Sequence, residues 1–79
     1  MNKEERNKIA EILSRRLSAY VYYSEEDIVV RYQRVGKELM CYPKGKGREP
    51  KEFNFKDNTY AQDALVFGEP TTKEIYEKF

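Results

Sequence analysis

The stretch Ile28 to Tyr42, IVVRYQRVGKELMCY, decides the fold because it reads as two strands joined by a tight turn. Residues in its first half alternate between two sides, as in a strand with one face in the core: Ile28, Val30 and Tyr32 on one side, Val29, Arg31 and Gln33 on the other. Gly36-Lys37 fits a two-residue type II′ turn, which requires glycine at its first position. The sequence therefore predicts an antiparallel hairpin that reverses at Gly36.

This turn also sets the register of the hairpin. The predicted pairs are Val35 with Glu38, Arg34 with Leu39, Gln33 with Met40, Tyr32 with Cys41 and Arg31 with Tyr42. Successive pairs face opposite sides of a sheet. The face away from the predicted core is therefore expected to carry Arg31, Gln33, Met40 and Tyr42.

A helix is predicted before the hairpin in the sequence. Residues Lys3 to Ser18 place four apolar side chains on one helical stripe, with Asn2 as the cap: Ile9, Ile12, Leu13 and Leu17. The stretch AYVYY that follows, Ala19 to Tyr23, fits either the last helical turn or the first extended residues. Tyr20, Tyr22 and Tyr23 are therefore left open between core and surface.

The C-terminal half predicts a third strand and further short helices. Lys51 to Phe55 alternates, with Phe53 and Phe55 on one side. Before it, Pro43 and Pro50 bracket KGKGRE, which predicts a mobile hairpin loop carrying Lys44, Lys46 and Arg48. Asp57 or Asn58 can cap a helix that ends at Gly68, and Thr71 with Glu74 forms a capping box for a last turn or two.

The predicted fold class is therefore α+β, in the order α-β-β-β-α-α. It consists of a three-stranded antiparallel sheet, an N-terminal helix and one or two short C-terminal helices. We expect residues 1–79 to form a single small domain, because a chain of 79 residues has material for only one modest core.

The composition argues against an enzyme. The chain has no His and one Cys, which excludes a Ser-His-Asp or Cys-His nucleophile system and an ordinary zinc site within it. Cys41 is expected to be buried, inert packing. Glu25, Glu26 and Asp27 are adjacent acids in a turn, which predicts a hydrated surface and no metal site. We expect no catalytic residue, no metal and no cofactor.

Charge and cysteine content bear on location and partners. Lys and Arg total 15 against 14 acidic residues, but residues 31–56 hold eight positive and three negative side chains. Nothing at the N-terminus resembles a signal peptide, and no apolar run approaches the roughly 20 residues of a membrane span. A lone Cys cannot form an intrachain disulfide, so we expect a cytoplasmic protein without a membrane partner.

The basic loop does not match a nucleotide-binding loop. A Walker loop needs GxxxxGK before Ser or Thr and a helix, whereas Gly47 is followed by Arg48, Glu49 and Pro50. The order α-β-β-β-α is similar to that of the double-stranded-RNA-binding domain. That family has a Lys-Lys-x-Ala-Lys element at its second helix, and this chain has KDNTYAQDA there, which leaves a shared order of elements only.

The resulting hypothesis is a small, non-catalytic protein-binding module, monomeric or homodimeric. It would act as an adaptor or as an inhibitor that occludes a larger partner, for example of phage or mobile-element type. Its expected binding residues are Arg31, Gln33, Met40, Tyr42, Lys44, Lys46 and Arg48, since Arg, Tyr and Met are enriched at interfaces. The alternative is RNA or DNA binding through the basic 31–56 region. A further alternative is that the C-terminal segment with Ile75, Tyr76 and Phe79 covers the face that carries Arg31.

Overall fold

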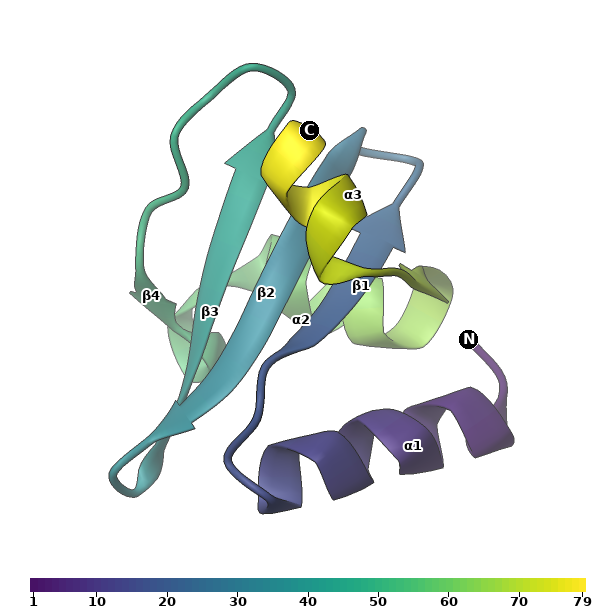
Figure 1. Ribbon diagram of the computed structural model, residues 1–79, viewed down its shortest axis with the longest axis vertical. Coiled ribbons are helices and arrows are strands. Elements are labelled where there is room, and N and C mark those ends of the chain that lie inside the picture. The colour runs from purple at the N-terminus through teal and green to yellow at the C-terminus, as the bar shows by residue number, and fades with distance from the viewer.

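The computed structural model describes residues 1–79 and shows an antiparallel sheet with helices on both of its faces (Figure 1). In chain order the elements are α1 (Lys3–Ser14), β1 (Ala19–Tyr23), β2 (Ile28–Val35), β3 (Glu38–Gly45), β4 (Phe53–Asn54), the 3-10 helix η1 (Phe55–Asp57), α2 (Thr59–Phe67), β5 (Glu69–Pro70) and α3 (Lys73–Lys78). The five strands lie in the order β4-β3-β2-β1-β5. The α+β class and the N-terminal helix are confirmed, but the predicted count of three strands was too small.

The central hairpin has the predicted register. β2 and β3 pair from Val35 with Glu38 to Ile28 with Gly45, and the five predicted pairs are all among them. Gly36 has a φ of 61°, and Lys37 is not in the positive-φ region, as a type II′ turn requires. Hydrophobic alternation and one glycine were therefore enough to set this register.

Helix α1 begins as predicted but ends earlier. Asn2 and Glu5 form a capping box, in which the Glu5 N–H donates to Asn2 Oδ1 at 2.8 Å and the Asn2 N–H donates to Glu5 Oε1 at 3.1 Å. The helix stops at Ser14, and Arg16 has a φ of 61°, which helical backbone cannot adopt. Leu17 therefore leaves the apolar stripe of the helix, and its exposed fraction is 55%.

The ambiguous stretch Ala19 to Tyr23 forms strand β1. Its side chains alternate: Ala19, Val21 and Tyr23 are buried in the core, while Tyr20 and Tyr22 lie half-buried on the opposite face. β1 pairs with β2 along its whole length and with β5 at Val21 and Tyr22. Only Tyr23 among these three tyrosines is therefore a core residue.

The C-terminal elements differ from the prediction at two positions. The expected strand from Lys51 to Phe55 shrinks to Phe53–Asn54, because η1 starts at Phe55. The cap of α3 is Thr72, whose Oγ1 accepts the Ile75 N–H at 3.2 Å. Thr71 was the predicted cap, but its N–H extends the sheet by donating to the Tyr20 carbonyl at 2.9 Å.

Helix α2 matches its prediction. Asn58 caps it by accepting the Ala61 N–H at 2.9 Å, and the helix ends at Gly68. Its buried residues Ala61 and Ala64 join α1 and the sheet in the main core. The Tyr32 hydroxyl donates to the Ala61 carbonyl at 2.7 Å, which links β2 to α2 through the middle of that core.

Helices α1 and α2 share one face of the sheet, and α3 crosses the other (Figure 1). The core between α1, α2 and the sheet contains Ile9, Leu13, Ala19, Val21, Tyr23, Val30, Tyr32, Cys41, Ala61 and Ala64. We call the opposite face, which carries α3, the outer face. No helix of the chain has the length and apolar character that crossing a bilayer requires.

Candidate functional site

A row of side chains crosses the outer face from β1 to β3. The register places Tyr20 opposite Arg31, and Arg31 opposite Tyr42, so the three residues lie side by side on three strands. The Arg31 guanidinium carbon lies 4.0 Å from the centroid of the Tyr42 ring, within the range of a cation–π contact. Arg31, Gln33, Met40 and Tyr42 are all half-buried. They remain partly open to solvent on this face.

Helix α3 covers one end of the outer face. Tyr76 is the buried residue of α3, and its ring packs against Tyr20 with 5.4 Å between the ring centroids. The Tyr76 hydroxyl donates to the Tyr42 carbonyl at 2.8 Å. Phe79 packs against Tyr22 at 6.0 Å in the same way. The C-terminal segment thus seals the part of the face next to Val29, whereas Arg31 remains partly exposed.

Lys44 contacts α3 from the sheet and does not lie in the loop in which it was predicted. It lies within β3, opposite Val29. Its ammonium donates to the carbonyl oxygens of Tyr76 at 2.9 Å and Glu77 at 3.0 Å. These carbonyls end α3, where a cation is favoured by the helix dipole. Lys44 therefore anchors the C-terminal end of α3.

The basic loop is attached to the same end of the sheet. The Gly47 N–H donates to the Phe79 carbonyl at 2.8 Å, and the Arg48 N–H donates to the Gly45 carbonyl at 3.0 Å. The side chains of Lys46 and Arg48 are exposed, and no hydrogen bond or ion pair joins them to the rest of the chain. Figure 1 shows the loop at the opposite end of the hairpin from Gly36, next to the end of α3.

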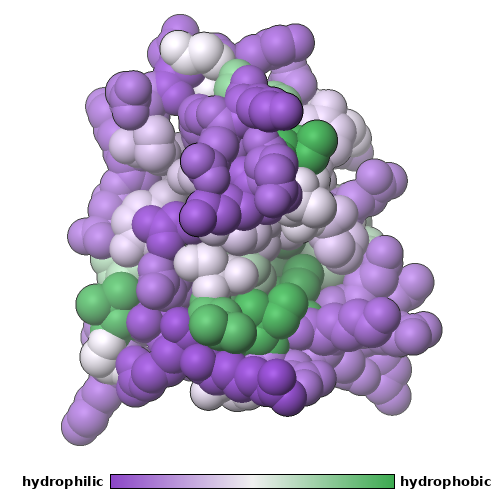
Figure 2. All heavy atoms as spheres, in the orientation of Figure 1, coloured by the Kyte–Doolittle hydropathy of each residue, from purple (hydrophilic) through white to green (hydrophobic).

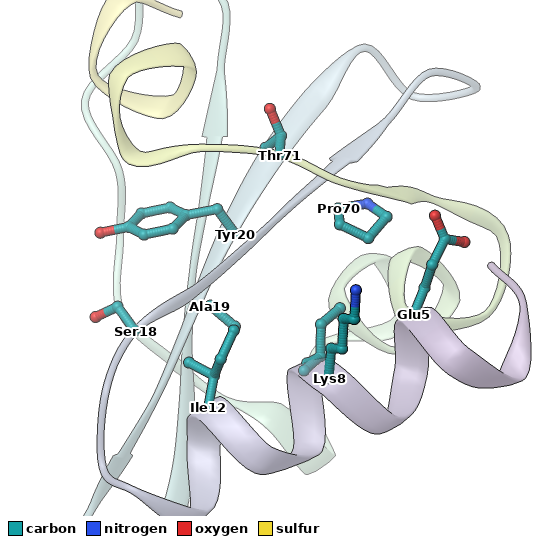
Figure 3. A pocket seen from close by; sticks show the side chains of 9 residues that line it. Glu5, Lys8, Ile12, Ser18, Ala19, Tyr20, Pro70 and Thr71 are labelled. Carbon is teal, nitrogen blue, oxygen red and sulfur yellow. The ribbon is translucent and has the colours of Figure 1, made fainter.

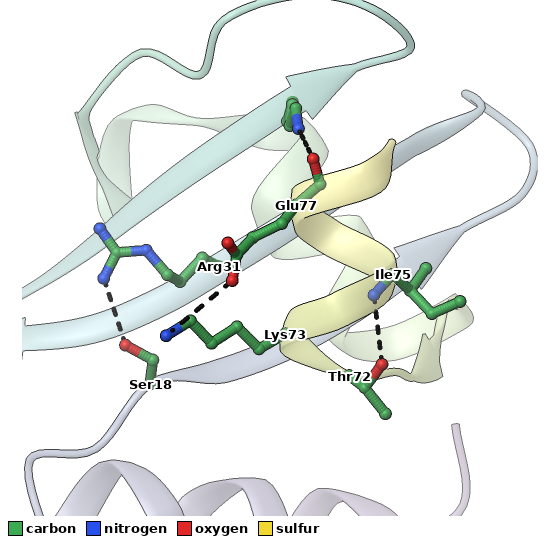
Figure 4. Close-up of polar contacts among 7 residues, drawn as sticks. Ser18, Arg31, Thr72, Lys73, Ile75 and Glu77 are labelled. Atoms are coloured by element: carbon green, nitrogen blue, oxygen red, sulfur yellow. Dashed lines mark hydrogen bonds and ion pairs between the residues drawn. The ribbon is translucent and has the colours of Figure 1, made fainter.

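Arg31 points toward the edge of the outer face near α1. Its Nη1 donates to Ser18 Oγ at 3.2 Å (Figure 4) and also to Gln33 Oε1. Burial raises the pKa of Tyr42, as does the hydrogen bond its hydroxyl donates to Glu52 at 2.8 Å, while the charge of Arg31 lowers it. The Tyr42 phenol therefore stays neutral at physiological pH, and its ring keeps the cation–π contact with the Arg31 guanidinium.

An apolar groove that the sequence did not predict adjoins this row. It runs between α1 on one side and β1 with Pro70 of β5 and Thr71 on the other, and has a volume of about 310 Å³ (Figure 3). Its lining residues are Glu5, Lys8, Ile9, Ile12, Ser18, Ala19, Tyr20, Pro70 and Thr71. Ser18 belongs to this lining and also bonds Arg31, so the groove and the outer-face row are continuous.

The groove continues along α1. A second hollow of about 340 Å³ shares Lys8 and Ile12 with the first and extends to Leu17. Figure 2 shows apolar surface gathered just above α1, where this helix faces the sheet. Leu17, with an exposed fraction of 55%, is the most exposed apolar side chain of this region. The early end of α1 produces this exposure.

The reactive groups of the chain lie away from this surface. Cys41 is fully buried, and its thiol donates to the Phe53 carbonyl at 3.6 Å. Burial raises the pKa of the Cys41 thiol to about 11, so the nucleophilic thiolate is scarce at neutral pH. No three His, Cys, Asp or Glu residues are grouped so that they could hold a metal ion. Neither Cys41 nor a group of metal-ligating side chains therefore lies at the outer-face row or in the groove.

No protein-family model, no curated protein and no solved structure matches this chain.

Proposed function

We propose that this chain is a small, non-catalytic protein-binding module. Its docking surface consists of the half-buried outer-face residues Arg31, Gln33, Met40 and Tyr42 together with the groove beside α1, including Ile12, Leu17 and Tyr20. The module acts as an adaptor or as an inhibitor that occludes part of a larger partner. The source of that partner, phage and mobile elements included, is left to experiment.

One observation supports this proposal above the others. An apolar groove lined by Ile9, Ile12 and Pro70 continues, through Ser18, into a row of Arg and Tyr side chains. Apolar pockets next to Arg, Tyr and Met are the composition at which interface hot spots concentrate. Helix and strand residues form most of this surface, so a partner would meet a preorganised shape at little entropic cost.

The chemistry of the buried groups supports a binding role over catalysis. Cys41 is enclosed and protonated, and the Tyr32 hydroxyl is engaged with a backbone carbonyl. Neither group lies in the groove. We also propose a cytoplasmic setting. The buried Cys41 thiol is protonated, and a single cysteine cannot form an intrachain disulfide, as is usual for proteins of reducing compartments.

A second candidate function is RNA or DNA binding. The observation that favours it is a set of exposed cations without ion-pair partners in the basic region: Arg34, Lys46, Arg48 and Lys51. Lys44, which the sequence had placed in this set, is engaged by the end of α3. Phosphate binding through these cations would weaken steeply with salt, whereas binding at an apolar groove would not.

Affinity capture from the source cell extract distinguishes the two functions. The bait proteins are the wild type, a Leu17→Ser/Met40→Ser double variant and a Tyr60→Ser control, each used at low and high salt and with and without nuclease. Tyr60 lies on α2, and its exposed fraction of 53% matches the 55% of Leu17.

We expect the wild type and the control to retain the same protein after nuclease treatment at high salt, and the double variant to lose it. Loss of every captured protein after nuclease or at high salt would replace this proposal with nucleic-acid binding. Equal capture by all three baits would show that the partner binds elsewhere.

A further inference from the structure

The acidic side chains that line the groove are already engaged within α1. Glu5 Oε1 accepts the Asn2 N–H at 3.1 Å in the capping box. Glu11 Oε1 accepts a hydrogen bond from Arg15 Nη2 at 2.8 Å, which is also an ion pair. Lys8 lines both parts of the groove and forms no ion pair. The formal charges of the lining therefore balance, and Lys8 is its one cation without an ion-pair partner.

Arg31 adds a second cation without a counter-charge. Its two hydrogen-bond acceptors, Ser18 Oγ and Gln33 Oε1, are neutral. The only ion pairs of the chain are Arg15 with Glu11 and Lys73 with Glu77, so no carboxylate reaches Arg31. A half-buried guanidinium that lacks an acidic partner can gain more from a new carboxylate than a fully hydrated cation can.

The donors of Arg31 are only partly used by neutral acceptors. Its two hydrogen bonds both come from Nη1. Burial raises the pKa of the neighbouring Tyr42 and Tyr76 phenols and the charge of Arg31 lowers it, so a carboxylate would approach the guanidinium beside these two hydroxyls. The Tyr42 ring, 4.0 Å from the guanidinium carbon, supports the guanidinium from one side. The donors are thus held in place before a partner arrives, which lowers the entropic cost of binding.

Ser18 connects this cation to the groove. Its hydroxyl accepts from Arg31, and Ser18 lines the same groove as Ile12 and Pro70. Figures 3 and 4 show Ser18 just before β1, in the connection that leads from α1 to this strand. A ligand that fills the apolar groove therefore has Arg31 within reach at one end and Lys8 on the α1 wall.

We infer that the docking surface recognises an acidic segment of a partner protein. One apolar side chain of that segment enters the groove between Ile12 and Pro70, and an adjacent Asp or Glu carboxylate pairs with Arg31. This inference rests on the proposed protein-binding function and adds the chemistry of the segment that is bound.

The apolar lining favours a protein over a nucleic acid as the occupant. A phosphate backbone could satisfy Arg31, but it has no side chain to fill a groove lined by Ile9, Ile12, Ala19 and Pro70. The loop that carries the exposed Lys46 and Arg48 is bonded to the Phe79 carbonyl through the Gly47 N–H, at the end of the β2–β3 hairpin opposite its turn (Figure 1). These two cations are not part of the groove.

The first test is selection from a displayed library of random peptides on the purified chain. We expect enriched peptides to contain Asp or Glu next to Leu, Ile, Met or Phe. Amide NMR shifts on adding one such peptide should be largest at Ile12, Ser18, Tyr20 and Arg31. A short single-stranded oligonucleotide serves as the competing probe.

The second test compares two arginines of the same strand. Arg31→Gln should lower the affinity for the selected peptide by about 10- to 100-fold, because it removes one partner of a desolvated charge pair. Arg34→Gln is the matched control, since Arg34 is also on β2 but exposed and on the opposite face. The same loss should follow Glu→Gln in the peptide, a change that cannot affect folding of the protein.

The outcomes separate this inference from the proposed function. Peptides that bind the groove without an acidic preference, or equal affinity of both arginine variants, would overturn the acidic-segment inference and leave protein binding in place. Absence of any enriched peptide, with NMR shifts at Lys46 and Arg48 on adding the oligonucleotide, would overturn both. Binding of neither probe would also overturn the inference.

Discussion

The Tyr76 hydroxyl donates a 2.8 Å hydrogen bond to the backbone carbonyl of Tyr42, and this contact ties α3 to the middle of β3. Helix α3 has six residues, too few to be stable alone in water. Its order must therefore come from its contacts with the outer face, of which Tyr76 makes the most buried one. The shape of the proposed docking surface beside α3 depends on this anchor.

Two substitutions of Tyr76 should destabilise the fold to different extents. Tyr76→Phe loses only the hydrogen bond and is expected to lower the free energy of unfolding by about 1 kcal/mol. Tyr76→Ala also removes a ring that is only 7% exposed, and the expected loss is about 3 to 5 kcal/mol. Urea unfolding monitored by circular dichroism measures both changes.

Tyr60→Phe is the control for the hydroxyl. Tyr60 is exposed on α2, and its hydroxyl makes no hydrogen bond within the chain, so we expect a change within about 0.5 kcal/mol. Equal unfolding free energies of the Tyr76→Phe and Tyr60→Phe variants would show that the bond to Tyr42 contributes nothing to stability.

Local sequence signals were sufficient to predict an element where one residue type at one position allows a single backbone structure. Gly36 at the first turn position and the alternation on both sides of it determine the hairpin register. Asn58 and Gly68 likewise bound α2, because a side-chain cap and a glycine stop act within one turn of the helix. The sequence left AYVYY open between helix and strand because no glycine or proline separates it from the predicted helix, which in the structure already ends at Ser14.

The candidate site could be predicted only in part. Arg31, Gln33, Met40 and Tyr42 share a face because the hairpin register places them there. The groove could not be foreseen, since it forms between α1 and a segment near Pro70 that the sheet brings beside Val21. Leu17 fitted the helical stripe by spacing, and only the left-handed Arg16 shows that the helix has already ended.

Gly68→Ala should be costly for a steric reason. A Cβ at this position would lie 2.6 Å from the Ala64 carbonyl, 2.6 Å from Val21 Cγ1 and 2.8 Å from the Tyr22 carbonyl. Two of these atoms belong to the backbone and cannot move aside, so we expect a loss of about 1 to 3 kcal/mol in the free energy of unfolding.

Gly45→Ala is the matched control for Gly68→Ala. Its added Cβ would meet only the flexible Arg48 side chain, at 3.4 Å, and we expect a change within about 0.5 kcal/mol. Chemical denaturation of both variants checks the difference. If Gly68→Ala proved as stable as Gly45→Ala, the close packing of α2 against β1 would be wrong.

The lysines of the basic region should differ in their effect on stability. Lys44→Met removes the two hydrogen bonds to the end of α3, and we expect it to lower the free energy of unfolding by about 1 to 2 kcal/mol. Lys46→Ser changes an exposed side chain without partners, and its effect should stay within about 0.5 kcal/mol. Thermal melts of the two variants measure this contrast, and equal melting temperatures would mean that Lys44 does not anchor α3.

Stability should fall at alkaline pH partly because Cys41 is buried. Burial raises the pKa of its thiol from 9.0 to about 11, so between these values the unfolded chain loses a proton that the folded chain keeps. The unfolded state then binds fewer protons, and the free energy of unfolding decreases as the pH rises. We expect the wild type to lose about 1 to 2 kcal/mol more than Cys41→Ala between about pH 8 and pH 10.5, measured by urea unfolding at each pH. The two proteins differ only at Cys41, so the difference between their profiles reports the effect of the thiol. Parallel pH profiles of the two proteins would show that water reaches Cys41 in the folded state.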